Sequence, residues 1–189
     1  SPRALTESEI LDLIQRYAHA ARVAQKTGFT GVQIHAAHGY LLSSFLSPIT
    51  NQRSDAWGGS LANRARFLLE TVRATRAAVG PNYPVAIKLN SDDFRQGGFS
   101  HEECLQVVAW LNDLQVDLLE ISGGTYEQPK LLGHTGRSDS IKTETLAVRT
   151  STRQREAYFL EYAAAIRKVA TMPLMVTGGF RSRQAMEQA

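Results

Sequence analysis

Two histidines and a tyrosine follow a short apolar segment in this chain of 189 residues. The segment runs from Gly31 to Ile34, and His35, His38 and Tyr40 come directly after it. Two imidazoles and a phenol at the end of a strand can bind a polarised oxygen and supply a proton. The alternatives are a structural cluster and a zinc site, although no thiolate or inward-facing carboxylate at ligand spacing would complete a zinc site. The elements that hold these residues must decide between the three interpretations.

The composition, with 43% hydrophobic and 21% charged residues, is typical of an ordinary globular domain. No segment approaches the roughly 20 apolar residues of a membrane helix, and the N-terminus has no basic and then apolar leader. We therefore expect a soluble, cytoplasmic protein. The net charge of +3 is scattered, which argues against a nucleic-acid partner. A single cysteine, Cys104, excludes an internal disulfide and a thiolate metal cluster within these residues, and we expect it to be a buried helix residue.

Capping patterns predict where three helices begin. Thr6 and Ser100 each stand three residues before a glutamate, which is the capping-box pattern, and Ser60 can cap the helix that lies between them in the chain. Apolar residues at helical spacing follow each of them, until Gly28 and Gly80 can end the first two helices. The chain therefore has long amphipathic helices that need a sheet to cover.

Four short apolar runs alternate with these helices and predict strands. A further helix is expected over 154–170, and a last one after Gly178 and Gly179. The polar stretch 125–153 has no periodicity, which predicts either a lid or binding loop or a solvated excursion. The predicted strands are Gly31–His35, Val85–Asn90, Asp117–Ser122 and Leu174–Thr177.

The alternation of side chains along these strands favours a barrel over a doubly wound sheet. In the second strand, Ile87 and Leu89 lie on one face and Lys88 lies on the other. The other strands likewise have one aliphatic face and one that turns polar toward the C-terminal end. A doubly wound sheet has two apolar faces, whereas a barrel has one helix-facing surface and an interior that opens on the active site. We predict an α/β fold, a partial (β/α)8 TIM barrel in a single domain, residues 1–189, truncated at both ends.

Several blocks of sequence are distinctive together. The first and most specific runs from Gly28 to Leu42, and others cover 45–48, 51–55, 58–61, 63–64, 87–90, 120–126 and 176–181. Over essentially the whole chain they resemble the old yellow enzyme family of FMN-dependent NAD(P)H oxidoreductases, also described as NADH:flavin oxidoreductases or NADH oxidase-like proteins. In that family's barrel the four predicted strands would be strands four to seven.

The resemblance implies a reaction for the histidines and the tyrosine. In the family, hydride passes from NADH or NADPH to FMN and then to the β carbon of an α,β-unsaturated carbonyl compound, an enone or quinone-like acceptor. His35 and His38 would bind the substrate by donating to its carbonyl oxygen, and Tyr40 would protonate the α carbon. The strand alternation independently points His35 inward, and a phenol with a pKa of about 10 stays protonated at neutral pH. Tyr126 would cover the substrate, and the family relationship allows a homo-oligomer.

The resemblance also implies which residues bind FMN. Lys88 would lie near flavin N1 and the C2 carbonyl, at a position where many relatives carry arginine. An ion pair with Glu120, two strands along and on the same face, is the alternative for Lys88, and the two roles can coexist. Gly178, Gly179 and Phe180 would lie at the phosphate of FMN, since backbone N–H groups after a barrel strand often bind phosphate.

The block between 51 and 64 is interpreted as scaffold. We expect Asp55 to pair with Arg53 or Arg64 and so fix the loop that supports the histidines. Trp57 stands where relatives often have tyrosine, and we expect this difference to affect packing rather than mechanism.

Two alternatives to an active ene-reductase remain open. A half barrel has two strand edges and an open core, so the chain could be a catalytically inactive barrel fragment that binds no flavin and pairs with another chain. The chain could also belong to a dienoyl-CoA reductase-like multidomain flavoenzyme with an iron–sulfur cluster and a second flavin domain. Cys104 alone cannot hold such a cluster, so further sequence would have to supply it.

Overall fold

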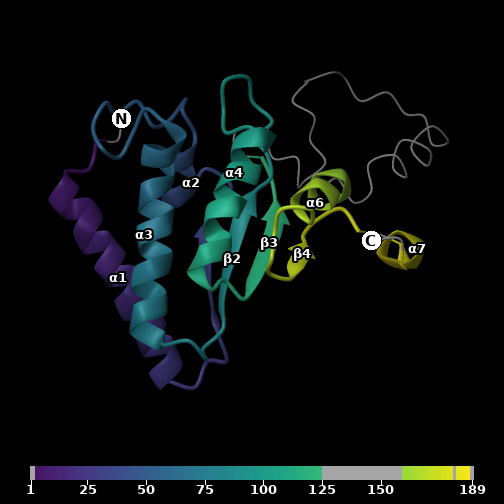
Figure 1. The fold of residues 1–189 in the computed structure, drawn as a ribbon, viewed down its shortest axis with the longest axis horizontal. Coiled ribbons are helices and arrows are strands. Elements are labelled where there is room, and N and C mark those ends of the chain that lie inside the picture. The colour runs from purple at the N-terminus through teal and green to yellow at the C-terminus, as the bar shows by residue number, and fades with distance from the viewer. Residues whose placement is uncertain (1–2, 125–158, 181, 188–189) are drawn as a thin grey trace, which may run out of the picture.

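Four parallel strands form one sheet in the order in which they follow along the chain (Figure 1). The computed structural model describes residues 3–124, 159–180 and 182–187. Each strand is hydrogen-bonded to the next, and the connections between them carry helices, as a repeated β/α unit requires. The strands are β1 (Val32–Ala36), β2 (Val85–Asn90), β3 (Leu118–Ser122) and β4 (Leu174–Val176).

The predicted caps begin three of the helices. Thr6 and Ser100 form complete capping boxes with the glutamates three residues later, and the side chain of Ser60 accepts a hydrogen bond from the amide of Asn63. At the C-terminal end of the helix that Ser60 caps, Gly80 has a φ of 80°, a left-handed conformation that suits glycine. The helices are α1 (Glu7–Lys26), α2 (Leu41–Leu46), α3 (Leu61–Val79), α4 (His101–Leu111), α6 (Leu160–Ile166) and α7 (Arg183–Glu187), with a 3-10 turn at Asn112–Leu114.

A hydrophobic core lies between the helices and one face of the sheet. The helices α1, α3, α4 and α6 follow one another across that face (Figure 1). Ile34, Ile87 and Ile121, from three neighbouring strands, are at most 4% exposed. On the other face the side chain of Gln33 is exposed and that of Lys88 is 19% exposed. The sheet therefore has one helix-covered face and one polar face, and the predicted partial (β/α)8 barrel is confirmed.

Element boundaries differ from the predictions in a few places. The short helix α2 was not predicted, because six residues are too few to show helical periodicity. Within the part of the chain that the structure describes, the helix predicted over 154–170 is α6, and β4 ends at Val176 rather than Thr177. The predicted loop 125–153, with Tyr126, lies outside the described residues.

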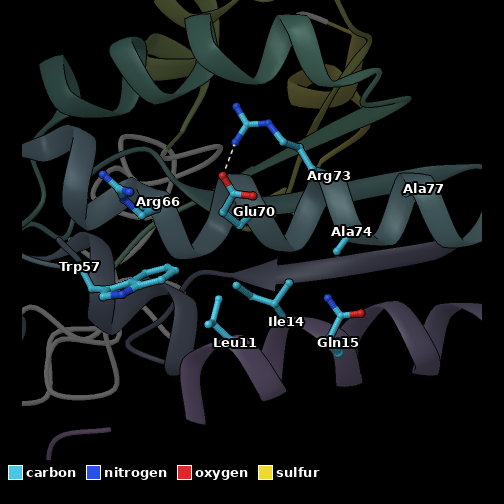
Figure 2. Close-up of a pocket in the computed structure, with 9 residues that line it drawn as sticks. All are labelled: Leu11, Ile14, Gln15, Trp57, Arg66, Glu70, Arg73, Ala74 and Ala77. Carbon is cyan, nitrogen blue, oxygen red and sulfur yellow. Dashed lines mark hydrogen bonds and ion pairs between the residues drawn. The ribbon is translucent and has the colours of Figure 1, made fainter. Parts of the chain in front are cut away.

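The helix layer carries a surface groove of about 580 Å³ between α1 and α3 (Figure 2). Leu11 lines one side, Arg73 lies on the other, and Trp57 lies at one end. Trp57 is 4% exposed, and the guanidinium of Arg66 lies 5.9 Å from the centre of its ring. Trp57 is therefore packed into the core next to the groove. No helix in the described ranges is both long enough and apolar enough to cross a membrane.

Candidate functional site

The histidine turn, residues 35–40, brings the two imidazoles and the phenol together at the C-terminal end of β1. His38 and Gly39 have φ values of 63° and 78°, and two successive left-handed residues reverse the chain before α2 begins. The ring centre of His35 lies 5.3 Å from that of His38 and 4.9 Å from that of Tyr40. The predicted convergence of these three side chains is therefore present.

Asn90 holds this turn from the end of β2. Its side-chain oxygen accepts a hydrogen bond from the amide of His38 at 3.1 Å. Its amide nitrogen donates to Asp93 and to the carbonyl oxygen of Gly124, both at 2.9 Å. Asn90 is 1% exposed, so the ends of β1, β2 and β3 are joined by a buried side chain. A non-glycine residue in the left-handed region is costly, and this network is what can keep His38 there.

Neither histidine ring is positioned to be charged at neutral pH. Burial is the first cause that lowers the pKa of both rings, and the charge of Lys88 lowers both further. The pKa of His38 falls to about 4. Each ring therefore has one N–H donor and one unprotonated nitrogen at neutral pH. A pair of neutral donors can stabilise a developing negative charge on an oxygen.

Lys88 and Glu120 form the ion pair that was expected as one role for Lys88. The Lys88 Nζ atom lies 2.8 Å from Glu120 Oε1, and the two residues are directly paired in the register of β2 and β3. They are therefore on neighbouring strands, and the expected separation of two strands was wrong. Glu120 also accepts hydrogen bonds from Gln33 and Thr177. Burial opposes its ionisation, but these hydrogen bonds and the one from Lys88 lower its pKa overall.

Glu120 thus connects all four strands across the polar face of the sheet. Gln33 lies on β1, Lys88 on β2, and Thr177 directly after β4. The carboxylate fixes the ammonium group of Lys88 at the centre of this face, near the histidine turn. Glu120 is 5% exposed. Because this buried carboxylate already pairs with Lys88, the ammonium group can also face a negatively charged ligand ring and keep its partner.

The glycine loop, residues 177–180, follows β4 at the same edge of the sheet. Gly178 and Gly179 have φ values of 103° and 78°, which glycine adopts without strain. The amide of Thr177 donates to the carbonyl oxygen of Ile121 at 3.1 Å, so the start of the loop is fixed to β3. These two glycines and Phe180 are half-buried and follow β4, and Lys88 carries a cation on the polar face. Backbone N–H groups after a strand and a nearby cation are the kinds of donor that suit the phosphate and the ring of FMN.

The segment 51–64, which was interpreted as scaffold, contains the ion pair that was expected for Asp55. Arg53 and Asp55 form an ion pair at 2.5 Å, and Arg53 also donates to the carbonyl oxygen of Leu5 at 2.7 Å. Arg64 does not pair with Asp55. It forms an ion pair with Glu103 of α4 instead, because its side chain is buried against that helix.

Metal and thiol chemistry have no support in the described parts of the chain. Among these residues, no group of three or more His, Cys, Asp or Glu side chains could hold a metal ion. Cys104 is 1% exposed, and burial raises the pKa of its thiol to about 12. The thiol is therefore protonated at neutral pH and part of the core, as expected for a buried helix residue.

Sequence comparison places this geometry among flavin enzymes. Residues 1–189 match the family model described as NADH:flavin oxidoreductase / NADH oxidase family. The chain is 41% identical, over 191 aligned positions, to an NADH-dependent flavin oxidoreductase of Talaromyces variabilis, and the alignment covers 100% of this chain and 44% of that protein.

Solved structures give the same picture. The fold is similar to that of an old yellow enzyme homologue from Zymomonas mobilis, with a TM-score of 0.71 and 29% identity over 98% of this chain and 47% of that one. It is also similar to a 2-naphthoyl-CoA reductase in complex with 2-naphthoyl-CoA, with a TM-score of 0.83 and 33% identity over 99% of this chain and 26% of that one. The chain spans less than half the length of each of these relatives.

Proposed function

Because the chain belongs to the NADH:flavin oxidoreductase / NADH oxidase family, we propose that the full-length protein is an FMN-dependent enzyme that reduces the C=C bond of α,β-unsaturated carbonyl compounds. NADH or NADPH would be the electron donor. Residues 1–189 would form part of one barrel domain of that protein. The observation that carries the proposal is the convergence of His35, His38 and Tyr40 on the polar face of the sheet.

The two histidines would bind the carbonyl oxygen of the substrate. When the C=C bond accepts hydride, negative charge develops on that oxygen, and two N–H donors aimed at it stabilise the transition state. Removing one donor from such a site typically costs about 2.7 to 4 kcal/mol. The rings can donate without being charged, because burial and Lys88 lower the pKa of both.

Tyr40 would supply the proton that completes the reduction. Its ring lies 4.9 Å from that of His35, and Tyr40 as a residue is 42% exposed. Hydride addition at the β carbon leaves the α carbon to be protonated. A positioned phenol can act there as the general acid.

Lys88 and the glycine loop would bind FMN, which when bound would supply the hydride that reaches the substrate. Lys88 would stabilise negative charge on the reduced ring, and Glu120 would keep the ammonium group in place at 2.8 Å. The backbone of Gly178, Gly179 and Phe180 would contact the phosphate. Tyr126 would cover the substrate from the segment after β3.

The test separates the two half-reactions of the full-length, flavin-bound protein. Its flavin is first reduced anaerobically with NADH or NADPH, and 2-cyclohexenone is then added while flavin absorbance is followed. In the double variant His35→Ala, His38→Ala, flavin should stay bound and its reduction should be unchanged, whereas reoxidation by the enone should slow by at least about 100-fold. His19→Ala, an exposed histidine on α1, is the matched control. Unchanged enone reduction in the double variant would refute the proposal.

A second candidate function is favoured by the similarity to the 2-naphthoyl-CoA reductase. That protein is much longer, since the alignment covers 26% of it. The full-length protein would then be a dienoyl-CoA reductase-like multidomain flavoenzyme that acts on an unsaturated acyl thioester. Iron content and a second flavin per chain, measured on the purified full-length protein, distinguish the two. If the purified protein contains neither iron nor a second flavin, the simple enone reductase is the remaining candidate.

A further inference from the structure

Ser122 contacts one ring nitrogen of His38. It is the last residue of β3 and is 0% exposed, and its Oγ atom lies 2.7 Å from His38 Nε2. The backbone of His38 is fixed separately by Asn90. The serine therefore acts on the imidazole ring itself and not on the turn that carries it.

The hydrogen bond between Ser122 and His38 can be made in two ways. Either the hydroxyl donates to an unprotonated Nε2, or a protonated Nε2 donates to the hydroxyl oxygen. Within the described ranges, His38 Nε2 is the side-chain partner of this hydroxyl. In the second arrangement the hydroxyl proton would be buried without an acceptor among these residues, which costs about 1 to 3 kcal/mol. The first arrangement satisfies both groups.

The position of the proton on His38 follows from this. A neutral imidazole that accepts at Nε2 carries its proton on Nδ1. Nδ1 is then the nitrogen that remains for a ligand, because Nε2 is occupied by Ser122.

His35 has the opposite arrangement. Its Nδ1 atom is buried and has no hydrogen-bond partner among the described residues. If that atom carried the proton, a buried N–H would be unpaired, which is rare in native structures. A proton on Nε2 avoids this and leaves Nε2 as the donor to a ligand.

We propose that Ser122 is a positioning residue that holds His38 as the Nδ1–H tautomer, so that His38 Nδ1–H and His35 Nε2–H act together as donors to one oxygen. This rests on the proposed function, because the shared ligand is the carbonyl oxygen of the substrate. The two rings, with centres 5.3 Å apart and planes at 75°, need opposite tautomers because opposite nitrogens are occupied or buried. A wrong tautomer would present a lone pair, which repels a developing oxyanion.

The direct test is the nitrogen-15 spectrum of the full-length, flavin-bound protein labelled in its histidine rings, at neutral pH. His38→Gln identifies the signals of His38. We expect a protonated Nδ1 and an unprotonated Nε2 for His38, and the reverse for His35. A protonated Nε2 on His38 in the wild type would overturn the proposal, and this measurement needs no variant of Ser122.

The functional test uses Ser122→Ala with Ser91→Ala as its control. Ser91 follows the last residue of β2, is 0% exposed, and its hydroxyl has no hydrogen-bond partner among the described residues. We expect Ser122→Ala to give His38 a mixture of tautomers. The affinity for 4-nitrophenol and the rate at which 2-cyclohexenone reoxidises the reduced flavin should each fall by about 10-fold, which corresponds to the loss of about one hydrogen bond. Flavin reduction by NADH should not change.

The outcomes separate the two proposals. Unchanged phenol affinity in Ser122→Ala, or an equal loss in Ser91→Ala, would overturn the role of Ser122 while the proposed function stands. A wild-type protein that neither binds the phenol nor reduces the enone would overturn the proposed function. The nitrogen-15 spectra of the wild type and of Ser122→Ala, compared, would still show whether Ser122 sets the tautomer of His38.

Discussion

The histidine turn is built more tightly than the glycine loop at the other end of the site. Asn90 and Ser122, which are 1% and 0% exposed, hold His38 from two neighbouring strands. By contrast, β4 has three residues, and its central residue, Met175, is 40% exposed. The difference lies in what holds each segment among the described residues. Two buried side chains fix the histidine turn, whereas Thr177, at the start of the glycine loop, is held by a backbone bond to Ile121 and a side-chain bond to Glu120.

The largest expected effect tests whether Tyr40 belongs to the substrate end alone. Tyr40→Phe removes the proposed general acid and keeps the ring, so reoxidation of reduced flavin by 2-cyclohexenone should slow by about 10²- to 10⁴-fold. Reduction of the flavin by NADH should remain unchanged. Rapid-mixing absorbance measures both half-reactions, with Tyr17→Phe on α1 as the control. Equal slowing of both half-reactions would mean that Tyr40 acts on the flavin and not on the substrate.

A smaller effect is expected when the support of the histidine turn is removed. Asn90→Ala deletes three hydrogen bonds and leaves the partly buried amide of His38 without this partner. At about 1 kcal/mol for each bond, the free energy of unfolding should fall by about 3 kcal/mol. Urea unfolding of the full-length protein measures it.

The control for Asn90 is Asn112, which bridges the end of α4 to the segment before β4. Its side chain donates to the carbonyl oxygen of Val169 and accepts from the amide of Thr171, both at 2.9 Å. Asn112→Ala should also lower stability, but only Asn90→Ala should slow reoxidation by the enone. If both variants slow it equally, the tight construction of the histidine turn has no specific role in the reaction.

Prediction from the sequence was most successful where a residue's role depends on its position along a single strand. The alternation of β2 placed Lys88 on the polar face, and the polar pattern of β3 made Glu120 available as its partner. The capping boxes at Thr6 and Ser100 are local patterns within four residues, and both are present. The cluster of His35 with His38 was predictable because one short turn carries both.

Roles that depend on the alignment of different strands were missed. The contact of Asn90 with His38 depends on the left-handed conformation at His38 and on where β2 ends beside β1. The contact of Ser122 with His38 likewise depends on where β3 ends beside the histidine turn, so spacing alone could not identify it. Asp55 was expected to pair with Arg53 or Arg64. It pairs with Arg53, whereas the long side chain of Arg64 reaches the adjacent helix α4 and pairs with Glu103.

A substitution in the glycine loop tests the other side of the comparison. Gly178 has a φ of 103°, and a side chain in a left-handed backbone costs roughly 1 to 2 kcal/mol. Relief of this strain should move the loop backbone away from the proposed phosphate site. Gly178→Ala should therefore weaken FMN binding by about 10-fold and leave the phenol affinity of the flavin-saturated protein unchanged. Gly80→Ala, at the C-terminal end of α3, introduces similar strain at a φ of 80° with no atom near the added Cβ.

Flavin fluorescence gives the dissociation constant of FMN for both glycine variants. Gly80→Ala should lower stability without changing FMN affinity. An unchanged FMN affinity in Gly178→Ala would remove the glycine loop from the proposed phosphate site. A loss of phenol affinity in the same variant would show that the two ends of the site are not independent.

The last expected effect is a dependence of stability on pH that originates at the histidine turn. Burial first, and then the charges of Lys88 and His35, lower the pKa of His38 from 6.5 to about 4, with Glu120 acting in the opposite direction. Between these values the unfolded chain binds a proton at this ring and the folded chain does not. The free energy of unfolding should therefore fall as the pH decreases from about 6.5 to about 4 and be constant above that range. His38→Gln should reduce this slope, whereas His19→Gln on the exposed side of α1 should retain it. Urea unfolding at several pH values measures the slope, and an equal slope in the wild type and His38→Gln would show that the turn does not hold His38 neutral.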